Sequence, residues 1–277
     1  MTVRPESSPS PAQAPSALGP LLEVEGLQVD YGRGKDRFRA VDNVAFRIPR
    51  HSTLGMVGES GSGKTTVGRA IVRLVRPAAG RILYGGTDLA TLSDKAFLPY
   101  RKRIQMIFQD PYSSLDPRLS IRTSLREALS LGHPARKADW EDILVEKMRL
   151  VGLDPGYLSR YPHEFSGGQR QRIGIARALC VEPEFLICDE PVSSLDVSIQ
   201  AQILNLLMDL QERLGLSYLF ISHDLRVVKH MAREVAVMQR GEIVELKPTD
   251  ELYGNPSHEY TRALLEAIPG RTASRGG

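Results

Sequence analysis

The chain of 277 residues has few cysteines, a single tryptophan and no long apolar run. Two cysteines, Cys180 and Cys188, are too few for a disulfide framework or a four-ligand metal site, and their apolar neighbours predict that both are buried. No run approaches the ~20 apolar residues that a membrane-spanning helix needs. The net charge of +3 is small, so the sequence gives no electrostatic reason to expect nucleic acid as a partner.

The N-terminus also lacks the apolar segment of a secretory signal. Residues 1–20 are rich in proline, serine and alanine, which predicts a disordered tail. The composition of the whole chain, 42% hydrophobic and 25% charged, is that of an ordinary globular protein near the upper size of one domain.

After the tail, short apolar runs alternate with segments of helical spacing. Apolar strands that alternate with helices predict a mostly parallel sheet covered on both faces. Between Tyr112 and Phe165 the strand pattern disappears, and this stretch is predicted to be a helical insertion. The main helices are expected over Lys64–Val75, Ser124–Leu131, Trp140–Val151, Arg170–Leu179 and Ser198–Leu214. The expected strands are Leu21–Val29, Ala40–Ile48, Thr53–Val57, Arg81–Tyr84, Ile104–Phe108, Phe185–Cys188, Tyr218–Ile221, Val235–Gln239 and Glu242–Glu245.

A glycine-rich loop separates the apolar run Thr53–Val57 from the following helix. Its residues are Gly58, Glu59, Ser60, Gly61, Ser62, Gly63, Lys64 and Thr65. Glycines let the backbone wrap a phosphate, and amides at the helix N-terminus face the anion. Lys64 would reach the β- and γ-phosphates, and Thr65 would bind Mg²⁺. A plain glycine turn is the alternative, and the strand and helix on either side argue against it.

Thr66, the next residue, is included in the predicted site. It occupies the position where a dinucleotide-binding fingerprint requires its third glycine, which excludes that class of site.

Two adjacent carboxylates, Asp189 and Glu190, follow the apolar run Phe185–Cys188. Neighbouring residues of a strand point to opposite faces, so the two can serve different atoms. Asp189 would hold Mg²⁺, and Glu190 would act as general base towards the attacking water. Such a pair is commonly a solvated strand end. Its place about 125 residues after a phosphate loop favours the catalytic interpretation.

Gln109 comes directly after one predicted strand, and His223 follows another with only Ser222 between them. Ligands bind at strand ends in parallel α/β sheets, so both are predicted catalytic positions. The Gln109 amide could accept from a water or offer an oxygen to Mg²⁺. The alternatives are a surface glutamine before an Asp-Pro turn and a structural or solvated histidine.

Residues 165–172 read Phe-Ser-Gly-Gly-Gln-Arg-Gln-Arg, and with the preceding motifs they make residues 22–268 resemble the ATP-binding cassette of ABC transporters. The resemblance implies an α/β P-loop cassette with a mostly parallel core sheet, an antiparallel β subdomain and a helical insertion at about 112–165. It implies ATP and Mg²⁺ as cofactors, with Tyr31 stacked on adenine. It also implies that the signature of one subunit closes on ATP held by another; that signature is Ser166, Gly167, Gly168 and Gln169.

Two further stretches resemble the ATPases of oligopeptide, dipeptide and nickel importers. Phe108–Arg118 is similar to the segment that these proteins present to their permease, and Asn255–Pro269 to their C-terminal extension. The implied domains are an ATPase domain at 21–245 and an extension at 246–277. The cysteine-rich tail of some relatives is absent, so no iron-sulfur cluster is expected.

The function expected from this resemblance is ATP hydrolysis that powers an importer of di- or oligopeptides. The expected partners are a second, non-identical ATPase subunit, two membrane permease subunits and an extracytoplasmic substrate-binding protein. The chain would be peripheral, on the cytoplasmic face of the inner membrane. An importer of nickel or another small solute is the main alternative. A soluble ABC ATPase that remodels nucleic acid or ribosomes is disfavoured by the single compact cassette, and a metabolic P-loop kinase has no use for the signature.

Overall fold

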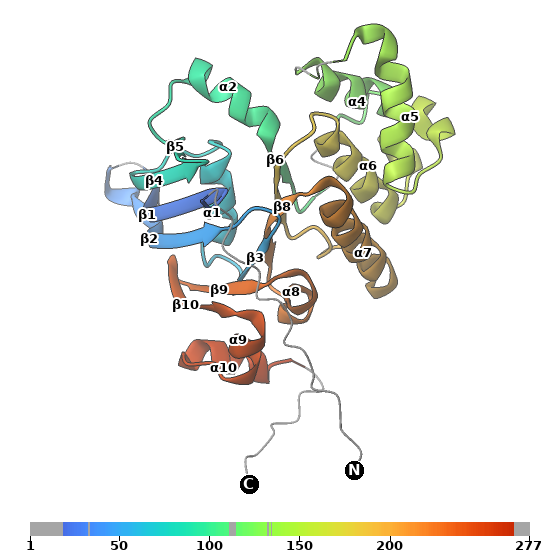
Figure 1. Ribbon diagram of the computed structural model, residues 1–277. Coiled ribbons are helices and arrows are strands. Elements are labelled where there is room, and N and C mark those ends of the chain that lie inside the picture. The colour runs from blue at the N-terminus through green and yellow to red at the C-terminus, as the bar shows by residue number, and fades with distance from the viewer. Residues whose placement is uncertain (1–18, 33, 111–114, 132, 134, 269–277) are drawn as a thin grey trace, which may run out of the picture.

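The computed structural model describes residues 19–268, except residues 33, 111–114, 132 and 134. The predicted N-terminal tail, apart from Gly19 and Pro20, lies outside the described residues. The described chain forms a four-stranded sheet in the order β2-β1-β4-β5, a six-stranded sheet in the order β10-β9-β3-β8-β7-β6, and surrounding helices (Figure 1).

The six-stranded sheet is parallel except at one edge. Its parallel strands are β3 (Thr53–Val57), β6 (Ile104–Ile107), β7 (Phe185–Asp189), β8 (Ser217–Ser222) and β9 (Glu234–Gln239). β10 (Glu242–Pro248) adds to β9 in the antiparallel sense. Every residue of β3, β7 and β8 is buried, which explains why these strands read as continuous apolar runs.

Each face of this sheet has its own apolar core. In β7, Phe185 and Ile187 pack with α1 (Lys64–Ile71) and the four-stranded sheet. Leu186 and Cys188 face the opposite core, which contains residues of α6 (Gly167–Leu179), α7 (Val197–Leu214) and α8 (Leu225–Met231). Alternation along the strand therefore builds a sheet covered on both sides, and the predicted α/β class is confirmed.

The four-stranded sheet is antiparallel. It consists of β1 (Leu22–Tyr31), β2 (Phe38–Ile48), β4 (Ala79–Tyr84) and β5 (Thr87–Asp88). Buried and more exposed residues alternate through most of β2, as expected for a strand with one face on a core. This sheet is the antiparallel β subdomain.

Helices form a separate lobe beside the β6 edge of the core sheet (Figure 1). α4 (Ile121–Ser130) and α5 (Trp140–Leu150) pack with α6, and buried side chains such as Leu125, Leu144 and Ile173 join them to the core. The short 3₁₀ helices are Gly34–Asp36, Lys137–Asp139, Pro155–Ser159 and Pro162–Glu164. Among the described residues no helix has the length and hydrophobicity needed to cross a bilayer.

Some helices differ from the sequence prediction or add to it. α1 ends at Ile71 rather than Val75, because Arg73 adopts the left-handed conformation (φ 56°) and turns the chain. α2 (Asp94–Arg103), which contains Pro99, is an additional helix, and the Ser93 side chain caps its N-terminus. The C-terminal extension forms α9 (Thr249–Gly254) and α10 (Glu259–Glu266) beneath β9 and β10 in Figure 1.

Candidate active site

The carboxyl ends of four parallel strands converge on one cleft of about 980 Å³. β3 leads into the glycine-rich loop. The other three strands lead to the predicted catalytic residues: β6 to Gln109, β7 to Glu190 and β8 to His223. Residues of the predicted site that line the cleft are Tyr31, Gly58, Glu59, Ser60, Gly61, Gly63, Lys64, Thr65, Thr66, Gln109, Glu190 and His223. The topology thus brings together residues that are up to 192 positions apart in the sequence, from Tyr31 to His223.

Two glycines of the loop are required by close backbone approach. A Cβ on Gly58 would lie 2.1 Å from the Met238 carbonyl oxygen, and one on Gly63 would lie 2.6 Å from the Ala40 carbonyl oxygen. Gly63, with φ 107°, is also the N-cap of α1. The loop is therefore fitted tightly between β2 and β9 at the start of the helix.

Lys64 is enclosed by the loop. Its side chain is buried, and its ammonium donates to the carbonyl oxygens of Gly58 and Glu59, both at 2.7 Å, and to Ser62 Oγ at 3.2 Å. Burial lowers the pKa of Lys64, and the carboxylates of Glu190, Asp189 and Glu59 oppose that change. The loop thus holds a cation at its centre, beside amides that point from the helix N-terminus.

Asp189 and Thr65 bring a carboxylate and a hydroxyl together beside the phosphate loop. The Thr65 hydroxyl donates to Asp189 Oδ1 at 2.9 Å. Burial raises the pKa of Asp189, although the hydrogen bond from Thr65 acts in the opposite direction. Within the described part of the chain, no cluster of three or more His, Cys, Asp or Glu side chains could hold a metal alone. A hydroxyl and a carboxylate that leave the remaining positions to phosphate and water fit Mg²⁺.

Glu190 lies between the two other predicted catalytic side chains. Its Oε2 atom accepts a hydrogen bond from Gln109 Nε2 at 3.1 Å and is 3.1 Å from His223 Nδ1. The backbone of Glu190 is in the left-handed region (φ 46°), which is uncommon for a residue with a side chain. Its amide donates to the Ile221 carbonyl at 2.9 Å, so β8 helps to hold the strained turn.

Tyr31, another residue that lines the cleft, stacks on Phe38. Their ring centroids are 5.7 Å apart and the planes differ by 27°. Phe38 is 60% exposed and also lines the cleft. The two rings offer an apolar surface of the kind that a nucleobase requires, and sequence reasoning had found only Tyr31.

The signature residues lie elsewhere. Ser166 caps α6: its hydroxyl accepts from the Gln169 amide at 3.3 Å, and Gln169 Oε1 accepts from the Ser166 amide at 3.0 Å. Ser166, Gly167, Gly168 and Gln169 are not among the residues that line the cleft. The phosphate loop and the signature of one chain therefore do not share a site.

The structure adds residues to which sequence reasoning gave no role. Arg39, Arg240, Gly241 and Leu264 line the cleft, and the Glu59 amide donates to Tyr260 Oη at 3.0 Å. The only sequence signals were the turn at Arg240-Gly241 and the C-terminal stretch that contains Tyr260 and Leu264. Neither pattern indicated proximity to the phosphate loop.

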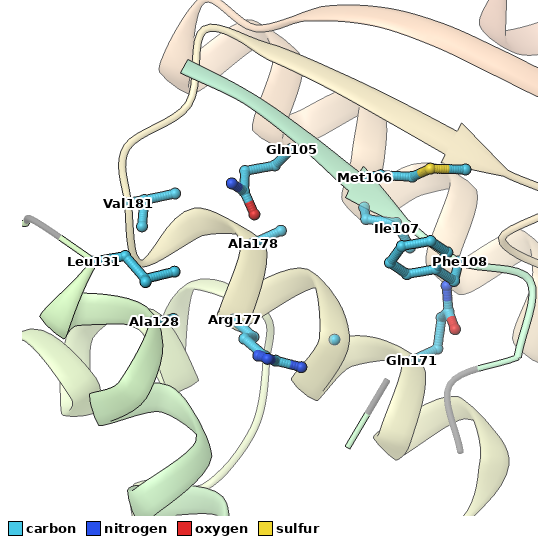
Figure 2. A pocket seen from close by; sticks show the side chains of 11 residues that line it. Gln105, Met106, Ile107, Phe108, Ala128, Leu131, Gln171, Arg177, Ala178 and Val181 are labelled. Atoms are coloured by element: carbon cyan, nitrogen blue, oxygen red, sulfur yellow. The ribbon is translucent and has the colours of Figure 1, made fainter. Parts of the chain in front are cut away.

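A second, smaller hollow of about 150 Å³ lies between β6 and the helical lobe (Figure 2). It is lined by Gln105, Met106, Ile107, Phe108, Ala128, Leu131, Gln171, Gly174, Arg177, Ala178 and Val181. Leu131 at the end of α4 is 67% exposed. Phe108 lines this hollow and the next residue, Gln109, lines the cleft, so a single peptide bond connects the two linings. The predicted permease-facing stretch begins here, although its residues 111–114 are outside the described chain.

Comparison with known proteins identifies the family. The family model described as ABC transporter matches residues 41–193. A Brucella ovis protein named for peptide import and ATP binding is 52% identical over 250 residues, which cover 90% of this chain and 79% of that protein. The oligopeptide transport ATP-binding protein OppF of Streptococcus mutans is 49% identical over 251 residues, covering 90% of this chain and 82% of OppF.

A solved structure agrees with this result. The ATP-binding cassette MJ0796, as a dimer in a post-hydrolysis state bound to ADP and Pi, matches with a TM-score of 0.74 and 25% identity. The match covers 82% of this chain and 98% of that one. The chain belongs to the ABC transporter family of ATP-binding proteins.

Proposed function

We propose that this chain is the ATP-hydrolysing subunit of an importer for di- or oligopeptides. The observation that carries the proposal is the arrangement of Lys64, Thr65 and Glu190 around one cleft, with Asp189 hydrogen-bonded to Thr65. It is supported by relatives of about 50% identity that are named for peptide import and oligopeptide transport. The roles that follow are part of the proposal.

The phosphates of ATP bind at the loop. Lys64 exchanges part of its contact with loop carbonyls for phosphate oxygens, and the amides at the start of α1 face the same anion. Thr65 and Asp189 hold Mg²⁺, which neutralises charge on the β- and γ-phosphates when bound. Tyr31 and Phe38, which also line the cleft, contact the base.

Glu190 orients the attacking water and accepts its proton. Its hydrogen-bond partner Gln109 and its neighbour His223 fix the carboxylate at the cleft, as a general base requires. The signature of a second cassette then completes each site, because the signature of the same chain lies apart from its own cleft. Head-to-tail closure of two cassettes places a helix N-terminus against the γ-phosphate.

The hollow of Figure 2 receives a short segment of a membrane permease subunit. Its lining is largely apolar, and Leu131 is exposed beside it. Its position supports this occupant, because a displacement at Phe108 is passed through one peptide bond to Gln109, which contacts Glu190. Two permease subunits, a second and non-identical cassette and an extracytoplasmic binding protein complete the importer. This chain is then peripheral, on the cytoplasmic face of the membrane.

The proposal is tested by uptake in a strain that lacks this gene. Labelled di- and oligopeptides are compared with labelled nickel, and wild-type and Glu190→Gln genes are returned on a plasmid. Loss of peptide uptake that only the wild-type gene restores supports the proposal. Loss of nickel uptake alone assigns the alternative cargo. Unchanged uptake of both, in a strain without a redundant importer, refutes the transport function.

A further inference from the structure

The C-terminal extension contacts the phosphate loop directly. The Glu59 amide donates to Tyr260 Oη at 3.0 Å across 201 positions of sequence. Leu264, one turn further along α10, lines the cleft. Residues four apart on a helix lie on the same face, so one face of α10 carries both contacts.

We propose that α10 forms part of the nucleotide site, with Tyr260 as a positioning residue for the phosphate loop and Leu264 as part of the cleft wall. This inference rests on the proposed function, because it assumes that the cleft binds ATP. It assigns the extension a role in nucleotide affinity within its own chain.

α10 is held firmly enough for this role. Thr261 and Leu265 are buried against the rest of the chain. Glu245 of β10 accepts hydrogen bonds from the amides of Ser257 and His258 at 2.7 and 3.0 Å, just before the helix begins. The helix is therefore fixed at its N-terminus and along one side. Because α10 is held in place, the hydrogen bond between Tyr260 and the Glu59 amide restricts the motion of the phosphate loop.

The contact is compatible with bound phosphate. Glu59 is the second residue of the loop, whereas the amides at the N-terminus of α1 begin several residues later, near Gly63. Tyr260 therefore fixes the first turn of the loop and leaves those later amides free to face an anion. Preorganising a binding loop increases affinity by reducing the entropy lost on binding. A neutral hydrogen bond of this kind corresponds to about 2- to 10-fold in a dissociation constant.

The test is a titration of the full-length chain with a fluorescent ATP analogue. Tyr260→Phe removes only the hydroxyl that accepts from Glu59. Tyr253→Phe is the matched control, because its hydroxyl donates to the Leu225 carbonyl and lies in the same extension. Leu264→Ala tests the cleft wall, and Lys64→Ala tests the nucleotide site itself. Thermal denaturation of each variant measures stability separately, and amide hydrogen exchange follows the peptide that contains Glu59.

We expect Tyr260→Phe to weaken analogue binding about 2- to 10-fold. Its melting temperature should stay near that of the wild type, and exchange at Glu59 should become faster. Leu264→Ala should also weaken binding. Tyr253→Phe should lower the melting temperature and leave both the dissociation constant and Glu59 exchange unchanged.

The outcomes separate the two proposals. If the wild type does not bind the analogue, or Lys64→Ala binds it equally well, the proposed nucleotide site is wrong and this inference fails with it. If the wild type binds, Lys64→Ala does not, and Tyr260→Phe matches the wild type, only the role of α10 is overturned. Equal weakening by Tyr260→Phe and Tyr253→Phe, in step with lost stability, overturns it as well.

Discussion

Replacing Glu245 with glutamine should loosen the C-terminal extension. The Glu245 carboxylate is buried and accepts from the Ser257 and His258 amides, and Lys247 Nζ lies 3.2 Å from it. A glutamine side chain has only one acceptor oxygen. Its NH₂ group would face either a backbone amide or the Lys247 ammonium, so one donor would lose its partner.

The magnitude follows from the pKa of this carboxyl. Burial by itself would raise that pKa, but the nearby Thr261 hydroxyl, the two amides and Lys247 stabilise the carboxylate, outweigh burial and lower the pKa of Glu245 from 4.5 to about 2. A difference of that size corresponds to about 3 kcal/mol of folding free energy above pH 4.5. Water at the edge of the site screens part of this, so we expect about 1–2 kcal/mol.

The sign of the pH dependence is fixed by the direction of the change. The folded-state pKa lies below the unfolded one, so the stabilisation is complete above pH 4.5 and is lost as the pH falls towards about 2. Urea denaturation of the wild type and Glu245→Gln at several pH values between 7 and 3 measures it. The difference in unfolding free energy should be largest at pH 7 and should shrink below pH 4.5.

Glu242→Gln is the matched control, because Glu242 is an exposed residue on the same strand. It should change stability by less than about 0.5 kcal/mol. The reasoning is refuted if Glu245→Gln is as stable as this control at pH 7. A stability difference that stays constant between pH 6 and pH 3 would equally show that the carboxylate charge is not responsible.

Three further substitutions address the cleft and its surroundings. Glu190→Gln should bind ATP and lose hydrolysis by about 10²-fold, since it removes the general base; near-normal phosphate release would exclude that role. Lys64→Ala should fail at nucleotide binding, which a fluorescent analogue titration measures, and wild-type affinity would contradict the phosphate-site assignment. Gly168→Ala should destabilise the chain by about 1–3 kcal/mol in urea, because the added Cβ would lie 2.5 Å from Ile199 Cγ2. Gly254→Ala, where a Cβ meets nothing within 4 Å, should show no such loss.

The core sheet could be predicted because its strands are buried on both faces. A strand such as β7 has no polar side to interrupt its apolar run, so Phe185 to Cys188 stands out in the sequence. The polar residues that follow each run mark the carboxyl edge, where the structure places Gln109, Glu190 and His223 together. Local pattern and global topology carry the same information at these positions.

Local rules failed where tertiary contacts override them. Pro99 argues against a helix, yet α2 forms around it, because Ser93 caps its first turn and Phe97 is buried in the core that also contains residues of the antiparallel sheet. α1 was expected to continue to Val75 because apolar spacing persists. Its end is set instead by the turn at Arg73, whose guanidinium bonds to the Ser93 carbonyl and Asp94. These partners lie 20 and 21 residues away in the sequence, far beyond the three- to four-residue spacing of helix neighbours.

The contact between Tyr260 and Glu59 shows why part of the site is invisible to sequence reasoning. A tyrosine in a C-terminal helix has no local pattern that names its partner, and the partner here is a backbone amide, which every residue except proline possesses. Only the chain path through β9, β10 and α9 brings α10 back to the loop after β3. Sequence motifs identify residues whose chemistry and spacing are unusual, such as Lys64 in the glycine-rich loop. Groups that act by position become visible only when the fold has placed them, and these are the residues for which substitution experiments are most informative.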